Sequence, residues 1–173
     1  SDIDEVIKKR ILDKTDEAKT SLKMIYDKEE SIIRNLLTFT NATYQKVYED
    51  SEDFAETYPF IPYQFTLLQN VFTDIRKHGY AGKHLSSGER SLLGAFQETA
   101  KRFGDSEVGT LIPFYAFYDT IEQFLEHQVK IVINNAIDTV KSGELKEIDI
   151  KVLKMLFMLK NIKEIPANID NLS

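Results

Sequence analysis

HLSSGERSLLGAF, residues 84–96, contains the clearest helix start in this chain. Ser86 and Glu89 have the Ser-x-x-Glu spacing of a capping box, in which each side chain accepts a hydrogen bond from a backbone N–H of the first turn. The residues that follow repeat apolar side chains at helical spacing: Leu92, Leu93, Phe96, Ala100 and Phe103. The stretch therefore predicts a capped amphipathic helix over residues 87–103, with Gly104 just beyond its end.

Arg90 lies in the first turn of this predicted helix. The N-terminal end of a helix favours negative charge, so a cation gains nothing from the helix dipole there. Two interpretations of Arg90 are open at this point. The side chain is either a solvated surface residue or a ligand for an anion, and a capping box by itself is a structural device.

Apolar residues recur at helical spacing in most other segments, and the few glycines and prolines separate these segments. Thr15 or Asp16, Pro62, Asp119 or Thr120, and Asp149 suit helix starts. The predicted helices are 3–13, 16–39, 62–78, 87–103, 119–141, 150–161 and one that begins at 166. In the helix 119–141, the apolar spacing predicts a buried face of Ile121, Phe124, Leu125, Val132, Ala136 and Val140. The predicted fold class is all-α.

The acidic, polar stretch 40–58 is predicted to be a loop, and it suggests a domain boundary. We expect three units. Residues 1–53 form an N-terminal helical hairpin or arm, residues 54–147 form a helical bundle, and residues 148–173 begin a helix-turn-helix or winged-helix unit that is cut off. For the last unit, a generic helical hairpin is the alternative. Because the chain begins without methionine and ends in a predicted helix start, we expect a piece of a longer protein.

Composition excludes several classes of function. The chain has no cysteine, which rules out disulfides, thiolate catalysis and cysteine-based zinc sites. Its net charge is −6, and residues 1–58 carry −5 of it, so bulk attraction to nucleic acid is not expected. Residues 150–173 carry +2, which leaves a local basic face. No apolar run approaches the ~20 residues of a membrane helix and no signal peptide is visible, so we expect a cytoplasmic protein.

The motifs of common enzymes are missing from the sequence. There is no G-x-x-x-x-G-K-[ST] phosphate loop and no G-x-S-x-G nucleophile elbow. The three histidines, His78, His84 and His127, form no metal motif and are interpreted as surface or capping residues. Asp119 fits a helix N-cap better than a perturbed acid. The aromatic residues Tyr115, Phe117 and Tyr118 fit core packing better than base stacking.

Three stretches taken together resemble a known family. They are YPFIPYQFTLLQ (residues 58–69), LSSGERSLLGAF (85–96), and VLKMLF (152–157) with IPANIDNL (165–172). In this order they resemble the BrxC-type P-loop proteins of the BREX (bacteriophage exclusion) system, which are bacterial phage-defence ATPases of the AAA+ type. The resemblance covers most of residues 54–173, and the N-terminal arm is less distinctive.

The resemblance implies an internal fragment of such an ATPase, without the P-loop. Residues 60–141 would be its helical lid. Arg90 would be the sensor 2 arginine that contacts the γ-phosphate, with Ser86, Ser87 and Glu89 supporting the helix start. The parent protein would use ATP and Mg²⁺, and its partners would be its own ATPase core, other BREX proteins or further copies, and DNA through the C-terminal region.

Two hypotheses of function follow. In the first, the chain is the lid or regulatory part of a BREX ATPase and couples nucleotide state to DNA or partner binding, without catalysis of its own. In the second, it is a non-catalytic helical adaptor, and the acidic arm 1–53 binds a partner or another copy of the chain.

Overall fold

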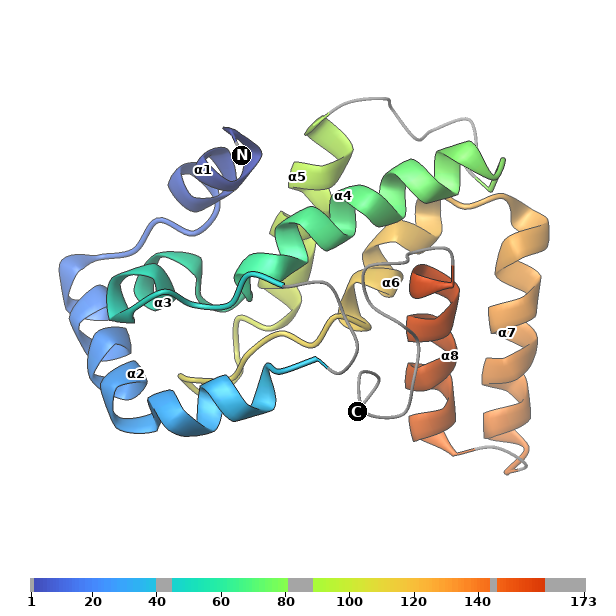
Figure 1. Ribbon diagram of the computed structural model, residues 1–173. Coiled ribbons are helices and arrows are strands. Elements are labelled where there is room, and N and C mark those ends of the chain that lie inside the picture. Colours follow the sequence, from blue (N-terminus) through green and yellow to red (C-terminus); the bar gives the residue numbers. More distant parts are fainter. Residues whose placement is uncertain (1, 40–44, 81–88, 144–145, 161–173) are drawn as a thin grey trace.

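The computed structural model describes residues 2–39, 45–80, 89–143 and 146–160, and within these ranges every regular element is a helix (Figure 1). The all-α prediction is confirmed. The elements are α1 (Asp2–Arg10), α2 (Asp16–Leu36), α3 (Ser51–Thr57), α4 (Pro62–Lys77), α5 (Glu89–Arg102), α6 (Ala116–Ile121), the 3₁₀ helix η1 (Glu122–Phe124), α7 (His127–Lys141) and α8 (Glu147–Leu159).

The centre of the molecule is an aromatic cluster between α4, α5 and α6. Phe60, Phe65, Phe96 and Phe117 are each at most 1% exposed. The Phe96 ring lies 4.9 Å from that of Phe60 and 5.1 Å from those of Phe65 and Phe117, measured between centroids. Such rings bury large areas in edge-to-face geometry, so this cluster fixes how the three helices cross.

Pro62 begins α4 as predicted, and the buried Gln64 completes this helix start. The backbone N–H of Ile61 donates to Gln64 Oε1 at 3.0 Å, and Gln64 Nε2 donates to the carbonyl of Ile112 at 2.9 Å. One side chain therefore pairs two buried backbone groups that are far apart in the sequence.

The N-terminal helices lie at one end of the molecule (Figure 1). α2 packs against α3, whereas α1 packs against α5, so α1 and α2 do not form the expected hairpin with each other. The loop prediction for 40–58 is wrong at α3, where Asp50 caps a short helix by accepting from the N–H of Asp53 at 2.8 Å. Phe54 of α3 is buried against Tyr26 of α2, with ring centroids 5.2 Å apart, and this contact holds the short helix in place.

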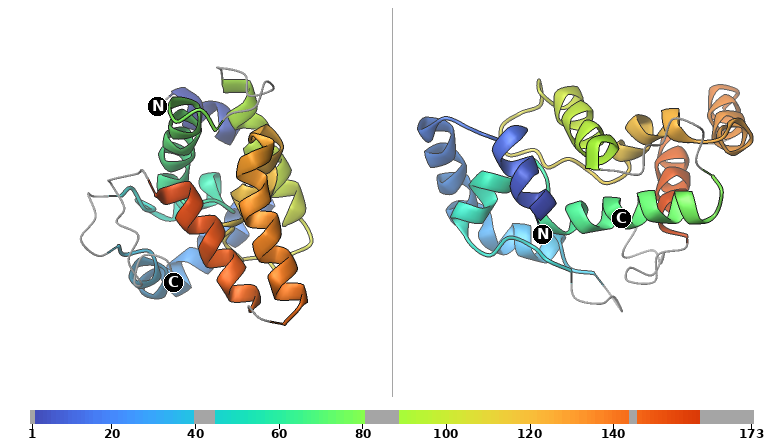
Figure 2. Two further views of the ribbon diagram at one scale, coloured as in Figure 1. Left: turned by 90° about the vertical axis from the view of Figure 1, so that its right-hand side faces the viewer. Right: turned by 90° about the horizontal axis from the view of Figure 1, so that it is seen from above.

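The opposite end is a hairpin of α7 and α8 (Figure 2). The prediction of one helix over 119–141 is wrong. The chain breaks between η1 and α7, where Leu125 is extended and buried and the N–H of Glu126 donates to the carbonyl of Tyr80 at 2.8 Å. This tertiary hydrogen bond replaces a helical one, and no glycine or proline marks the break.

Other predicted helix ends had mixed outcomes. Thr15 caps α2, since its hydroxyl accepts from the N–H of Ala18 at 3.2 Å. Asp149 lies inside α8, where its carboxylate accepts from the N–H of Lys146 at 2.8 Å, so the predicted start was late. Gly104 follows α5 without a positive φ; the left-handed glycines beyond helix ends are Gly79 and Gly143.

The predicted division into residues 1–53, 54–147 and 148–173 stays a prediction. Its first boundary falls inside α3, and one cluster of buried apolar residues extends from Ile3 of α1 to Leu159 of α8. The helix that was predicted to begin at residue 166 lies outside the described residues.

Candidate anion-binding cleft

Arg90 is the second residue of α5, so its predicted place in the first turn of a helix is confirmed. Ser86 and Ser87 lie outside the described residues, and so does the side chain of Glu89. The capping box and its supporting role therefore stay predictions. The structure also shows which face of α5 carries Arg90.

α5 divides its residues between two faces. Leu92, Ala95 and Phe96 are buried in the core, while Arg90 and Gly94 lie on the other side of the helix. These last two residues are one turn apart, and Gln97 continues the same face. Together with the end of α1, this face lines an open cleft of about 540 Å³: Arg10, Ile11, Arg90, Leu93, Gly94 and Gln97.

The cleft brings together two exposed arginines that are eighty positions apart in the sequence, Arg10 and Arg90. Within the described ranges, neither guanidinium forms an ion pair. Arg10 ends α1, where the helix dipole favours a cation, and Arg90 begins α5. Two guanidinium groups on one cleft suit a phosphate or carboxylate, because each offers parallel N–H donors to two oxygens.

Gly94 contributes no side chain to the wall of the cleft. A Cβ atom at this position would meet no other heavy atom within 4 Å, so the glycine is not required by packing. Gly94 lines the same cleft as the two arginines.

Sequence reasoning found Arg90 and missed Arg10. The available signal was the run Lys8-Lys9-Arg10 at the end of the first predicted helix. A basic last turn usually only complements the helix dipole, so this run did not indicate a site without knowledge of the packing of α1 against α5.

The other residues considered in the sequence do not join this cleft. His78 Nδ1 lies 2.9 Å from Asp74 Oδ1, His127 is the exposed first residue of α7, and His84 is outside the described residues. Across the described part of the chain, no three metal-ligating side chains come together.

Asp119 lies within α6 and is not a helix cap. Its carboxylate accepts from Lys154 Nζ at 2.6 Å and lies 3.9 Å from Arg102, so it joins α8 to α5. Its neighbours Phe117 and Tyr118 are fully buried, which confirms core packing for these two residues, whereas Tyr115 is only partly buried.

Lys14 has the most strongly lowered amine pKa among the described residues. Burial lowers its pKa to about 8. Its Nζ donates to the carbonyl of Leu12 at 2.7 Å and to that of Glu56 at 3.4 Å. These contacts join the α1–α2 connection to α3, so the role of this lysine is structural.

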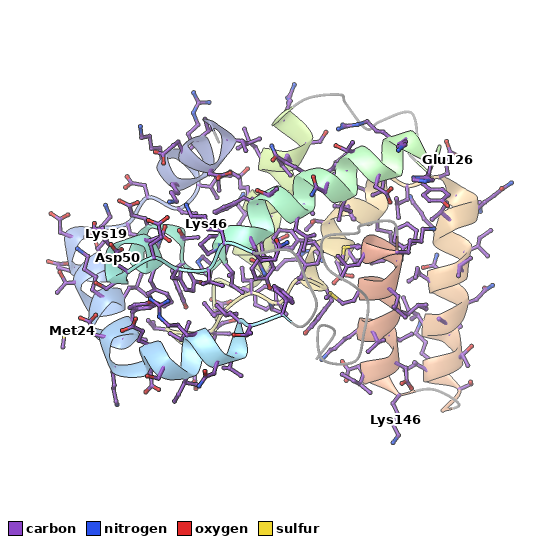
Figure 3. The ribbon with its side chains drawn as sticks, viewed as in Figure 1. Lys19, Met24, Lys46, Asp50, Glu126 and Lys146 are labelled. Carbon is purple, nitrogen blue, oxygen red and sulfur yellow. The ribbon has the colours of Figure 1, made fainter. Side chains whose placement is uncertain are left out.

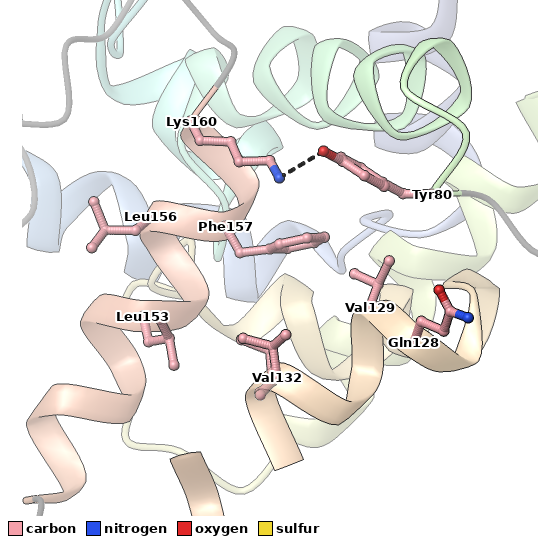
Figure 4. A pocket seen from close by; sticks show the side chains of 9 residues that line it. Tyr80, Gln128, Val129, Val132, Leu153, Leu156, Phe157 and Lys160 are labelled. Carbon is pink, nitrogen blue, oxygen red and sulfur yellow. Dashed lines mark hydrogen bonds between the residues drawn. The ribbon is translucent and has the colours of Figure 1, made fainter. Parts of the chain in front are cut away.

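A second concave surface lies between α7 and α8 (Figure 4). We call it the hairpin groove. Val132 and Leu153 face each other across it, and Lys160 closes one end by donating to Tyr80 Oη at 3.1 Å. Its volume is about 480 Å³ and it is lined by Tyr80, Gln128, Val129, Val132, Ile133, Leu153, Leu156, Phe157 and Lys160.

No protein family model matches this chain, and no solved structure matches it significantly. Among the described helices, none has both the length and the apolar character needed to cross a bilayer.

Proposed function

We propose that this chain is a regulatory, lid-like part of a phage-defence P-loop ATPase of the BREX type, and that Arg90 contacts a phosphate group of the bound nucleotide. The observation that supports the proposal is the cleft in which Arg90 and Arg10 meet without carboxylate partners among the described residues. ATP and Mg²⁺ would be held mainly by the parent protein, because this sequence has no Walker motif.

The arrangement suits a sensor better than a catalyst. The cleft offers cationic donors and the polar side chain of Gln97, and among the described residues that line it none is a carboxylate, a histidine or a nucleophile. Such a set can bind charge and stabilise one orientation of α5 against α1, but it supplies no group for proton transfer. Ligand binding would therefore change how the two helices pack.

Binding of tripolyphosphate to this chain, measured by titration calorimetry, tests the proposed site. Because each guanidinium contributes charge-assisted hydrogen bonds, Arg90→Ala and Arg10→Ala should each weaken binding. We expect a loss of only about tenfold for each, because both side chains are exposed and solvent screens their charge. The matched control is Lys101→Ala, which removes one positive charge from the other end of α5. Equal affinity in all four proteins would contradict the site.

The same substitution in the parent ATPase tests the function. Arg90→Ala should leave folding intact, since the side chain is exposed, and should impair nucleotide-dependent activity. ATP turnover and nucleotide affinity are the measurements. If both are unchanged in the variant, the sensor role is wrong.

A second function, that of a helical adaptor, is supported by a different observation. α2 exposes large apolar side chains. Met24 is 68% exposed (Figure 3), Ile32 is 56% exposed and Leu36 is 77% exposed. Exposed apolar side chains grouped on one element are typical of an interaction surface. Comparing association with and without residues 1–53 by light scattering tests this function, and unchanged association would count against it.

A further inference from the structure

We propose that this protein associates with itself head to tail, with α2 of one copy seated in the hairpin groove of the next. The inference deepens the adaptor function and is independent of the anion cleft. It rests on two apolar surfaces of similar length and complementary charge at opposite ends of the molecule.

The donor surface is one face of α2, which we call the α2 face: Ile25, Glu29, Ile32 and Leu36, spaced i, i+4, i+7 and i+11. This spacing keeps the four side chains within one side of a helix, as in helices that bind in grooves. Ile32 and Leu36 are mostly exposed, and Ile25 is half-buried near Gly109. The α2 face adjoins the buried face of the helix, so a partner would extend an apolar surface that already exists.

The acceptor is the hairpin groove, which two packed helices leave open. Val132 is 62% exposed and Leu156 is 37% exposed, and both belong to the mainly apolar lining of the groove. Two antiparallel helices offer a third helix a long groove, and filling it would bury these side chains in a three-helix arrangement.

Charge fixes the direction of the α2 face in the groove. Lys160 at the end of the groove contacts Tyr80 and Phe157 but forms no ion pair with a described carboxylate. Glu29 of the α2 face has no ion-pair partner among the described residues either. Pairing these two charges places Glu29 at the Lys160 end of the groove. Because the exposed apolar residues Ile32 and Leu36 follow Glu29 in the sequence, they reach the apolar part of the groove only when α2 runs antiparallel to α8.

The lengths of the two surfaces agree in this direction. Glu29 and Leu36 are seven residues apart, as are Lys160 and Leu153 on α8. At the rise of an α-helix, both spans are about 10 Å. With Glu29 beside Lys160, Leu36 therefore lies beside Leu153, at the apolar end of the groove.

The contact must involve a second copy. The views in Figures 1 and 2 place α2 and the α7–α8 hairpin at opposite ends of the molecule, with α4, α5 and α6 between them. A contact between different surfaces of two copies leaves one donor and one acceptor free. Association therefore continues beyond a dimer, as an open chain or a closed ring.

Sedimentation equilibrium of the full chain tests the proposal through complementation. The concentrations run from about 10 µM to about 500 µM, because small interfaces associate weakly. Wild type should exceed the mass of a dimer as concentration rises. Ile32→Glu destroys only the donor and Val132→Glu only the acceptor, so each alone should remain monomeric, with affinity reduced about a hundredfold or more by a charge in an apolar contact. Their equimolar mixture should form a dimer and stop there.

Two controls match these variants in added charge. Ser31→Glu lies next to Ile32 but off the α2 face, and Ile131→Glu lies next to Val132 but does not line the groove. Both should associate like wild type, and circular dichroism checks that all four variants keep their helix content. A monomeric wild type, a monomeric mixture, or controls that dissociate like the test variants would each overturn the proposal.

A charge exchange tests the direction of the contact. Glu29→Lys alone should weaken association about tenfold, and adding Lys160→Glu in the same chain should restore affinity to within about threefold of wild type. Failure of this restoration overturns the antiparallel alignment. If wild type associates but neither Ile32→Glu nor Val132→Glu changes it, the adaptor function survives while this contact is wrong.

Discussion

The aromatic centre and the α7–α8 hairpin differ in how completely they bury their apolar residues. In α4 nine residues are buried, whereas in α7 Ile133 alone is buried among the described residues. Both helices are of similar length and both contain many apolar residues. Because burial of apolar surface is the main stabilising contribution, we expect the centre to contribute more to stability than the hairpin, which leaves more of its apolar surface exposed.

Phe96→Ala should have the largest effect on the free energy of unfolding. Phe96 is fully buried and touches three other phenylalanine rings, so its removal leaves a large cavity and should cost about 3–5 kcal/mol. Urea unfolding followed by circular dichroism measures the loss. The matched change at the periphery is Leu36→Ala, which should cost less than about 0.5 kcal/mol. Similar losses for both would contradict a stabilising centre.

Gln64→Met should have the next largest effect. Methionine fills a similar volume but leaves the N–H of Ile61 and the carbonyl of Ile112 without partners in a buried place. We expect a loss of about 2–3 kcal/mol. Gln69→Met, on the same helix but not buried, is the control and should change stability little. A neutral Gln64→Met would mean that the two backbone groups find other partners.

A neighbouring pair in α7 sharpens the comparison within the hairpin. Ile133 is 2% exposed and Val132 is 62% exposed, although the sequence pattern placed Val132 on the buried face. Ile133→Ala should cost about 2 kcal/mol and Val132→Ala less than about 0.5 kcal/mol, because truncation creates a cavity only at a buried site. Equal losses of stability for the two substitutions would support the original prediction that Val132 is buried.

The smallest effect concerns pH. Because burial lowers the pKa of Lys14 to about 8, the unfolded chain holds this proton more tightly than the folded chain. Stability therefore rises with pH between about 8 and the ordinary lysine pKa, and the rise should disappear in Lys14→Met. Comparing the two proteins from about pH 7 to about pH 9.5 isolates the lysine from the buried tyrosines, whose raised pKa values act at higher pH. Parallel curves would contradict the assignment.

The sequence predicted the helical class because long segments such as 16–39 and 62–78 have strong apolar periodicity and clear caps. It missed α3, which has seven residues and is held by the contact of Phe54 with Tyr26 rather than by its own propensity. It also missed the break before α7, since the hydrogen bond from Glu126 to Tyr80 joins distant parts of the chain.

The sequence predicted one of the two arginines of the candidate site. Arg90 could be found because its position at a helix start is a local property of the sequence. Arg10 and the cleft could not, because they depend on the packing of α1 against α5. The hairpin groove could not be predicted either, because the sequence pattern assigned Val132 to the core, whereas its side chain is exposed.

The short helix α6 has a consequence for local opening of the structure. With six residues it is too short to be stable alone, and it is held on one side by α5 and on the other by α8. Thr120 contacts Thr99 of α5, and Asp119 binds Lys154 of α8. Amide hydrogen exchange in α6 therefore reports on both neighbours: its protection can last no longer than the attachment of the hairpin to the centre.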